Sequence, residues 1–418
     1  MDREYFLLIF FSSLIILSYV FNLIAQKIKV PSVLLLLATG ISIRLLIPDI
    51  GDAIQNLGTV LSLVGTLGLI LIVLEGSLDL EFSKQKLPLI GSSFFAAIII
   101  LLLTNFLVAT VIYKLVPGIS FKASFVNAIP LSIISSAIAI PSVEQIGKNK
   151  REFIVYESIF SDVFGILIFN FVVFTENIAP SSFGFLFVDL AIVALIGFIF
   201  TALLLYFISK NQLKIRFFIL IAVLILLYTS GKVLHFSSLL IIFIFGIILN
   251  NTQYIPIRWI TKFIRIEVLR ENIEQFKMIT VESAFLIRTI FFFIFGYSLL
   301  ITNLFDQTLI LTGSLILFIL YGIRFLYLRF LVRANLFPEL FIAPRGLITI
   351  ILYYSIPDEY SIGLISEGLL FYIILMSSLI MMVGLMLKSE TEVDSHVFMG
   401  RKEMEFGENI DIDKLEKD

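Results

Sequence analysis

Charged side chains are rare inside the long apolar segments of this chain, and their positions indicate where chemistry could occur. The stretch YESIFSDVFGILIFNF, residues 156–171, holds Glu157 and Asp162 within a run of Ile, Phe, Val and Leu. Ionisable groups inside a membrane are costly, so they usually face a polar cavity or each other and mark ion or proton paths. The membrane-embedded charges predicted from the sequence are Glu75, Glu157, Asp162, Arg288, Arg324 and Arg345.

Asp162 is the deepest acid in the sequence. It lies about ten residues into its predicted helix, which at about 1.5 Å per residue is near the middle of a hydrocarbon layer roughly 30 Å thick. Ser158 lies on the same helical face, whereas Glu157 and Ser161 lie on the neighbouring face, because each residue turns the helix by about 100°. A carboxylate beside a hydroxyl could hold a proton or exchange it for a monovalent cation, so that both would compete for one site.

Structural roles are the competing hypothesis for each of these charges. Asp162 could pair with an arginine and only hold helices together, but that role does not require the adjacent hydroxyls. For Glu157 the structural role is favoured, since a fixed pair with Arg324 or Arg345 would make both charges tolerable in a low dielectric. For Arg288 two positions remain open: one lining a core cavity, and one snorkelling to the membrane surface.

The elements that must position these residues are transmembrane helices. The chain has 418 residues, of which 59% are hydrophobic and 15% charged, whereas soluble domains have about 25% charged residues. It has no cysteine and only two histidines, so thiolate metal sites are excluded and no cofactor is expected. Apolar segments of roughly 17 to 25 residues predict an all-α polytopic membrane protein with about thirteen spans. The spans are predicted near 5–26, 31–48, 54–75, 88–115, 122–145, 152–175, 184–209, 214–230, 233–250, 281–302, 307–332, 339–356 and 362–388.

Lysine and arginine in the loops predict the orientation of the spans. With the N-terminus outside, most loop Lys and Arg residues fall on the cytoplasmic side, where an excess of them is expected. An odd number of spans then places the C-terminus inside. We therefore expect one transmembrane domain over residues 1–388 and a short, acidic, disordered cytoplasmic tail over residues 389–418.

Residues 250–277 are too charged to span a membrane. Trp259, Ile260 and Phe263 nevertheless form part of an apolar face beside basic residues. This pattern predicts a helix that lies on the cytoplasmic surface.

Two of the predicted spans are interrupted. Pro130 and Pro141 flank Ser135 and Ser136 in the fifth span, and residues 344–346, Pro-Arg-Gly, interrupt the start of the twelfth. Proline removes a backbone donor, and free backbone at membrane depth occurs only where it is buried in protein or lines a cavity. If helices 1–6 and 8–13 form two inverted repeats, the interrupted spans occupy equivalent positions and cross near a transporter binding site.

Several motifs together resemble the monovalent cation/proton antiporter superfamily, in particular its NhaP-like and NapA-like sodium/proton exchangers. The resemblance covers residues 1 to about 388, and its motifs occur in the order and on the helices that the family shows. In the electroneutral branch, the ion-binding helix carries Glu-Ser, two variable residues and Asn-Asp. The matching segments here are residues 157–162 (ESIFSD), 135–143 (SSAIAIPSV), 74–82 (LEGSLDLEF), 321–330 (YGIRFLYLRF) and 344–350 (PRGLITI).

The resemblance implies a role for each site residue. Asp162 would carry the proton or the cation, and Glu157 would pair with Arg324. Additional oxygen ligands for the cation would come from Ser158, the segment at Ser135 and Ser136, Ser161 and Glu75. The charges of Arg345 and Arg288 would belong to the core domain, although Arg288 is extra relative to the family pattern.

The resemblance also implies a fold and a cycle. A mobile core domain would move the site relative to a dimerisation domain, giving alternating access in a homodimer. Ser161 stands where the family has Asn or, in the electrogenic branch, Asp. Because serine does not titrate, one exchangeable carboxylate remains, which suggests one cation for one proton.

The function expected from the sequence is therefore sodium/proton antiport across the cell (inner) membrane, serving pH homeostasis. Potassium/proton exchange is the alternative, and lithium is a further candidate cation. The expected partners are these cations, the proton, the lipid bilayer and a second copy of the chain, with no nucleic acid. An ion channel or a membrane scaffold is less favoured, because no filter of repeated carbonyl-rich loops is visible, and an enzyme is not expected.

Overall fold

The computed structural model describes most of the chain as helix. The described residues are 3–28, 30–46, 57–143, 146–175, 180–210, 217–233, 238–252, 266–298, 306–332 and 337–387. Within these ranges there is no strand. The helices are α1 (Arg3–Ile28), α2 (Ser32–Leu46), α4 (Leu57–Asp79), α5 (Leu87–Leu115), α6 (Phe121–Ser132), α7 (Ser136–Ser142), α8 (Lys148–Phe174), α9 (Pro180–Lys210), α10 (Phe217–Val233), α11 (Ser238–Asn250), α13 (Ile266–Ser298), α14 (Gln307–Leu326), the π-helix η2 (Tyr327–Val332), α15 (Leu347–Tyr354), the 3₁₀ turn η3 (Asp358–Tyr360) and α16 (Glu367–Met386).

The all-α architecture predicted from the sequence is confirmed, and each of the thirteen predicted spans has a helical counterpart. The fifth span consists of two helices, α6 and α7, and the twelfth corresponds to α15. Seven helical stretches of the described chain are long and apolar enough to cross a membrane. The predicted tail, 389–418, lies outside the described residues.

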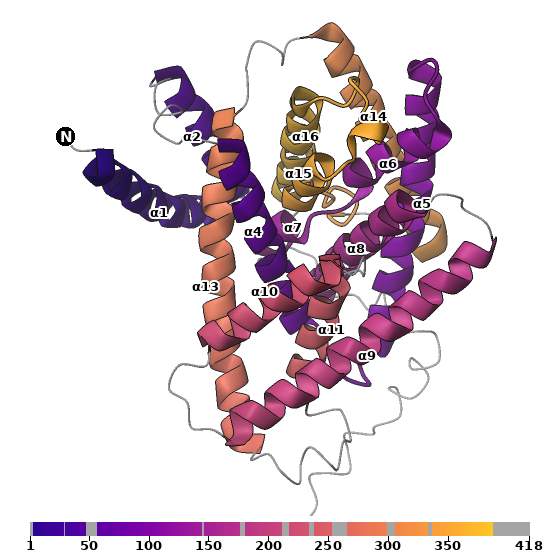
Figure 1. The fold of residues 1–418 in the computed structure, drawn as a ribbon. Helices are drawn as coiled ribbons and strands as arrows, with labels where there is room; N and C mark the ends of the chain where they lie inside the picture. Colours follow the sequence, from indigo (N-terminus) through magenta and orange to yellow (C-terminus); the bar gives the residue numbers. More distant parts are fainter. Residues whose placement is uncertain are drawn as a thin grey trace, which may run out of the picture.

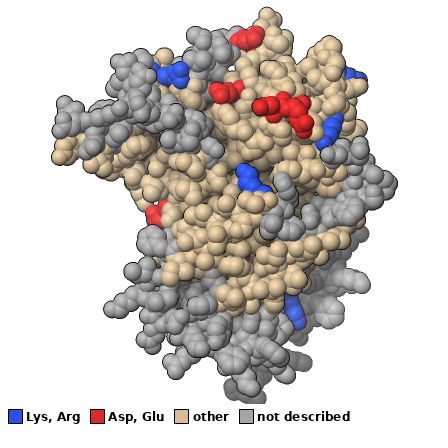
Figure 2. All heavy atoms as spheres, in the orientation of Figure 1, with Lys and Arg blue, Asp and Glu red and all other residues tan. Residues whose placement is uncertain are grey.

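Apolar side chains cover the outside of the helices as well as the interior. On α5, Val108 and Ile112 are fully buried while Phe95 and Phe106 are more than half exposed. Figure 2 shows that the described part of one face is mostly uncharged, with acidic and basic side chains at a few places. A helix that is apolar on all sides suits a lipid environment, in which every backbone polar group must be satisfied within the protein.

The helices lie in two groups (Figure 1). In one group, α13 packs against α2 and α4, and α11 packs against α4, α9 and α10. In the other, α5 packs against α6 and α8, and α14 packs against α16. The main hydrophobic core joins the two groups, since it includes Leu74 of α4, Phe292 of α13, Ile159 of α8 and Ile348 of α15.

Two predicted elements are wrong in their extent. The twelfth span was expected to begin near residue 339, but the chain is not helical until Leu347. Proline disfavours helix in the residue before it and cannot donate to the helix ladder, so the helix starts only beyond Pro344 and Gly346.

The predicted surface helix at 250–277 also differs. Residues 266–277 form the first turns of α13, which continues without a break to Ser298. Trp259, Ile260 and Phe263 lie outside the described residues. The charged residues of this segment exclude it from a predicted membrane span. They are nevertheless compatible with helical structure, so the helix itself extends through them.

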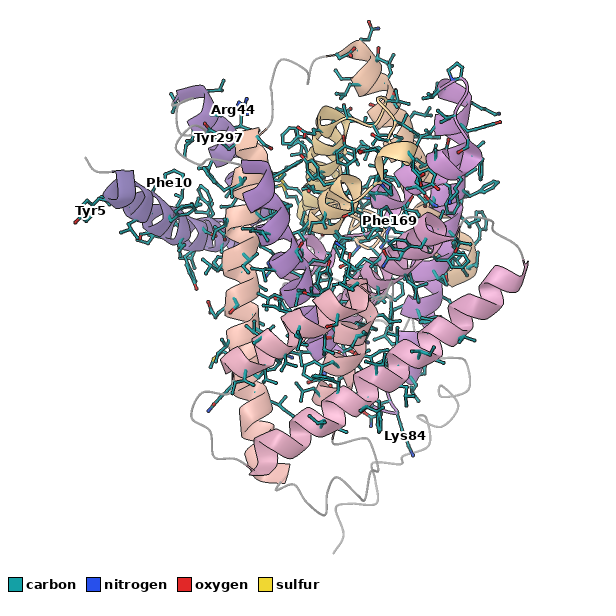
Figure 3. The ribbon with its side chains drawn as sticks, viewed as in Figure 1. Tyr5, Phe10, Arg44, Lys84, Phe169 and Tyr297 are labelled. Carbon is teal, nitrogen blue, oxygen red and sulfur yellow. The ribbon has the colours of Figure 1, made fainter. Side chains whose placement is uncertain are left out.

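The contact between α2 and α13 depends on two glycines that let the backbones touch. A Cβ atom added at Gly296 would lie 2.5 Å from the carbonyl oxygen of Leu37, and one at Gly40 would collide with the carbonyl oxygen of Phe293. At the end of this contact Arg44 lies beside Tyr297 (Figure 3). Its guanidinium donates to the carbonyls of Tyr297 and Ser298 at 2.7 and 2.8 Å, which satisfies the C-terminus of α13.

Replacing Gly296 by alanine tests this close approach. Adding a methyl group against a carbonyl forces the helices apart, and overpacking of this kind costs about 1–3 kcal/mol. We expect a lower unfolding temperature for Gly296→Ala in detergent. Gly322→Ala on α14 is the matched control, because no atom lies within 4 Å of its added Cβ. Equal unfolding temperatures for the two variants would contradict the prediction.

Candidate ion-binding site

Asp162 lies near the middle of α8 and is 3% exposed. Its Oδ2 atom accepts a hydrogen bond of 3.2 Å from the backbone N–H of Ser136. Its Oδ1 atom is buried and has no hydrogen-bond partner in the described part of the chain. Buried polar atoms are nearly always paired, so an unpaired carboxylate oxygen at this depth indicates a place for a proton or a ligand.

The two interrupted segments cross beside this carboxylate. The N–H of Ser135, between α6 and α7, donates to the carbonyl of Pro344 at 2.8 Å. A Cβ atom at Gly346 would lie 2.6 Å from Ser135 Oγ, so glycine is needed for the segments to approach. Each segment thus supplies backbone partners to the other, which is how broken helices survive at membrane depth.

The serines predicted as ligands differ in their partners. Ser161 Oγ accepts from the N–H of Ile134 at 2.9 Å, so it ties α8 to the interrupted segment. Ser158 Oγ donates to the carbonyl of Val155 on its own helix at 3.1 Å. Ser135 Oγ is buried and, like Asp162 Oδ1, has no hydrogen-bond partner among the described residues. Of the serine hydroxyls, that of Ser135 is therefore the most available to a cation.

Glu157 faces away from the crossing and meets Arg324. Two hydrogen bonds of 2.6 and 2.8 Å join its carboxylate to the guanidinium, and both side chains are only 1% exposed. The Nε atom of Arg324 donates to the carbonyl of Glu339 at 2.9 Å. The geometry is the bidentate one that arginine offers a carboxylate, and it links α8, α14 and the segment before α15.

Arg345 binds the C-terminus of α6, which is the first half of the interrupted fifth span. Its guanidinium donates to the carbonyl of Leu131 at 2.9 Å and to those of Ser132 and Ala343. Leu131 and Ser132 are the last residues of α6. A cation at a helix C-terminus satisfies the free carbonyls and complements the helix dipole.

Glu75 and Arg288 form a second ion pair on the other helix group, so Arg288, which was expected as a charge of the core domain, lies outside the group that carries Asp162. Their closest atoms, Glu75 Oε1 and Arg288 Nη2, are 3.3 Å apart. Of the two positions left open for Arg288, the structure shows the one that lines a cavity, whose walls also include Ala137 and Pro141 of α7.

Two cavities approach the crossing from different sides. The cavity that includes Arg288 has a volume of about 210 Å³ and reaches Ala137, the residue after Ser136. The other, of about 660 Å³, reaches Ile166, one turn after Asp162. Asp162 lines neither of these cavities.

Some of the groups around the site are not visible in the sequence. The amides of Ile134 and Ser136 and the carbonyl of Pro344 act through the backbone, so no residue type marks them. Glu339 is buried beside Lys150, with 3.5 Å between Oε1 and Nζ. The sequence does contain a signal for Glu339, an acidic residue at the start of an apolar segment. The predicted boundary of the span, however, placed Glu339 at the membrane surface.

Crossed, interrupted helices beside a buried carboxylate define a class of protein, the secondary transporters. A family model described as "Sodium/hydrogen exchanger, transmembrane" matches residues 11–390. The chain therefore belongs to the sodium/hydrogen exchanger family, whose members are antiporters rather than enzymes, and it is a multi-pass membrane protein.

Solved structures of an archaeal antiporter share this fold. The structure of the sodium proton antiporter MjNhaP1 from Methanocaldococcus jannaschii at pH 8 superposes with a TM-score of 0.64 at 17% sequence identity, covering 93% of this chain and 99% of that one. An electron-microscopy map of the same antiporter gives 0.63 at 18% identity, covering 91% and 94%. A search of curated proteins finds no match.

Breaking the Glu157–Arg324 pair should destabilise the protein more than it alters transport. Removing one partner leaves an uncompensated buried charge, which costs about 3–5 kcal/mol. We expect Glu157→Ala to lower the unfolding temperature in detergent while the apparent cation affinity of the folded fraction changes little. The double variant Glu157→Leu/Arg324→Met should recover much of the loss. A well-folded Glu157→Ala protein with a large change in cation affinity would instead assign Glu157 to the ion site.

Proposed function

We propose that this protein exchanges one monovalent cation, sodium in the first place, for one proton, and that both bind in turn at Asp162. The single observation that carries the proposal is the buried carboxylate at the helix crossing, with one oxygen bonded to a backbone amide and the other unpaired. Membership of the sodium/hydrogen exchanger family supports it.

The cation would be held by oxygen atoms around Asp162. Hard cations prefer carboxylate, carbonyl and hydroxyl oxygens. Asp162 Oδ1 and Ser135 Oγ have free lone pairs, and carbonyls of the crossing segments add further acceptors. Ser158 and Ser136 would join this shell as the segments shift. Ser161 would act mainly by holding the amide of Ile134.

One cation for one proton follows from the charges at the crossing. Ser161 cannot titrate, and the carboxylate of Glu157 is occupied by the bidentate contact with Arg324. Of the two buried carboxylates on α8, Asp162 is then the one that is free to change partners. Neutralising one negative charge either with a proton or with a monovalent cation moves no net charge through the cycle.

Alternating access would occur by movement between the two helix groups. The group containing α5, α6, α7, α8, α14, α15 and α16 carries Asp162 and would be the mobile core. The remaining helices would form the dimerisation domain of a homodimer in the cell membrane, with the N-terminus outside. One cavity reaches Ala137, beside the amide that binds Asp162, and the other reaches Ile166, one turn along α8, so the two are suited to serve as the alternating approaches.

Replacing Asp162 by asparagine should abolish exchange, because the amide neither binds a proton nor neutralises a cation. We expect proteoliposomes containing Asp162→Asn to show the exchange rate of empty liposomes, with an unfolding temperature at least as high as that of the wild type. The control is Asp358→Asn on the surface turn η3, which should leave exchange unchanged. Full activity in Asp162→Asn would refute the assignment.

Exchange measured with the membrane potential clamped at two values tests the stoichiometry. A one-for-one cycle should give the same rate and the same reversal condition at both potentials, because no net charge crosses the membrane. Running the assay with sodium, potassium and lithium in turn, across pH, identifies the cation. Faster exchange with potassium would favour the alternative substrate, and a clear dependence on potential would rule out the one-for-one cycle.

A further inference from the structure

The cavity beside α7 contains a charge arrangement that the exchange site does not use. Glu75 on α4 and Arg288 on α13 meet at 3.3 Å, and their side chains are 13% and 14% exposed. A second nitrogen of Arg288 lies 3.5 Å from the carbonyl oxygen of Ala137. Arg288 therefore reaches from one helix group to the interrupted segment of the other, one residue from the amide that binds Asp162.

This pair differs from the fixed pair of Glu157 and Arg324. The latter has two contacts, of 2.6 and 2.8 Å, between side chains that are 1% exposed. Glu75 and Arg288 have one longer contact and line a cavity of about 210 Å³. A single, long contact beside a cavity holds its partners less firmly, so another cation can replace the guanidinium at Glu75.

The other charges around the cavity are already engaged. Glu282, on the cavity wall, accepts a hydrogen bond of 2.6 Å from the hydroxyl of Tyr19. Asp79, one turn beyond Glu75, lies 2.8 Å from Lys277. A cation that enters this cavity toward Ala137 therefore meets Arg288 and its partner Glu75 as the innermost charges on the wall.

We propose that Arg288 is a built-in competitor of the transported cation: it occupies Glu75 on the approach to the exchange site and sets the apparent cation affinity. The proposal rests on the proposed function, since it assumes that a cation travels through this cavity to Asp162. The contact of Arg288 with the carbonyl of Ala137 also connects α13 to the interrupted segment. Release of Arg288 would therefore accompany movement between the helix groups.

Opposite changes of charge in the cavity should have opposite effects. Arg288→Gln makes the cavity one charge more negative and leaves Glu75 free to attract the cation. Glu75→Gln makes it one charge more positive and leaves Arg288 to repel the cation. At the separations expected inside a cavity, one charge changes an apparent affinity by roughly three- to tenfold.

The test is a mutant cycle in proteoliposomes, with the apparent KM for sodium and the turnover measured separately. We expect a lower KM for Arg288→Gln, a higher KM for Glu75→Gln, and a KM within about twofold of wild type for the double variant, in which the cavity regains its original net charge. Single variants that leave KM unchanged, or that shift it in the same direction, would overturn the proposal.

The neighbouring pair provides a matched control. Asp79→Asn and Lys277→Gln change charge by the same amounts on the same two helices, but their side chains are 29% and 39% exposed and lie outside the cavity wall. Solvent screens them, so their KM values should stay within about twofold of wild type. Equally large, opposite shifts in the control pair would assign the effect to general surface charge and overturn the role of Arg288.

The experiment still tests the role of Arg288 if Arg288→Gln does not fold. In that case the KM of Glu75→Gln is the test, because only a raised KM for sodium agrees with the proposal. The proposed function itself would be refuted if proteoliposomes with the wild-type protein showed no exchange, or if those with Asp162→Asn showed full exchange. By contrast, an active wild type, an inactive Asp162→Asn and unshifted KM values would refute only the role of Arg288.

Discussion

The backbone hydrogen bond from Ser135 to Pro344 is the interaction on which the rest of the site depends. Two spans are interrupted at membrane depth, where free amides and carbonyls find no water. Each interruption is stabilised by the other and by nearby side chains: Ser161 accepts the amide of Ile134, and Arg345 binds the last carbonyls of α6. Once these groups are satisfied, the amide of Ser136 is directed at Asp162, which lies one turn beyond Ser158 on α8.

The two pairs of buried charges around this crossing differ in the number and length of their contacts. Glu157 and Arg324 are bidentate and fully enclosed, so the energy lost on burial is offset only while both remain in place. Such a pair joins α8 to α14 and leaves Asp162 as the other buried carboxylate of α8. Glu75 and Arg288 share one longer contact beside a cavity, an arrangement that permits exchange of one cation for another. The same two residue types thus serve rigidity at one place and regulation of affinity at another.

Close packing inside one helix group and two cavities near the crossing form the surroundings of the site. The glycine contacts between α2 and α13 bring these backbones close enough to touch. The interrupted segments contain the short helices α7 and α15, of which α7 lines the cavity at Ala137 and α15 lines the cavity at Ile166. Asp162 lines neither cavity; the nearest lining residues are Ala137, next to the residue whose amide binds Asp162, and Ile166, one turn further along α8.

The sequence by itself determined the membrane class, the number of spans and the small set of charges worth examining, because a run of apolar residues long enough to cross a bilayer and a charge within it are both local features. It also marked Pro130, Pro141 and Pro344, since proline acts on the backbone next to it. Only the tertiary structure decided that α15 starts at Leu347 and that Arg288 lies against Glu75; the contact of Glu157 with Arg324 agrees with the pair that the motif resemblance implied. These outcomes depend on which helices lie side by side and on backbone groups such as the amide of Ser136, and neither is encoded by residue type at a single position.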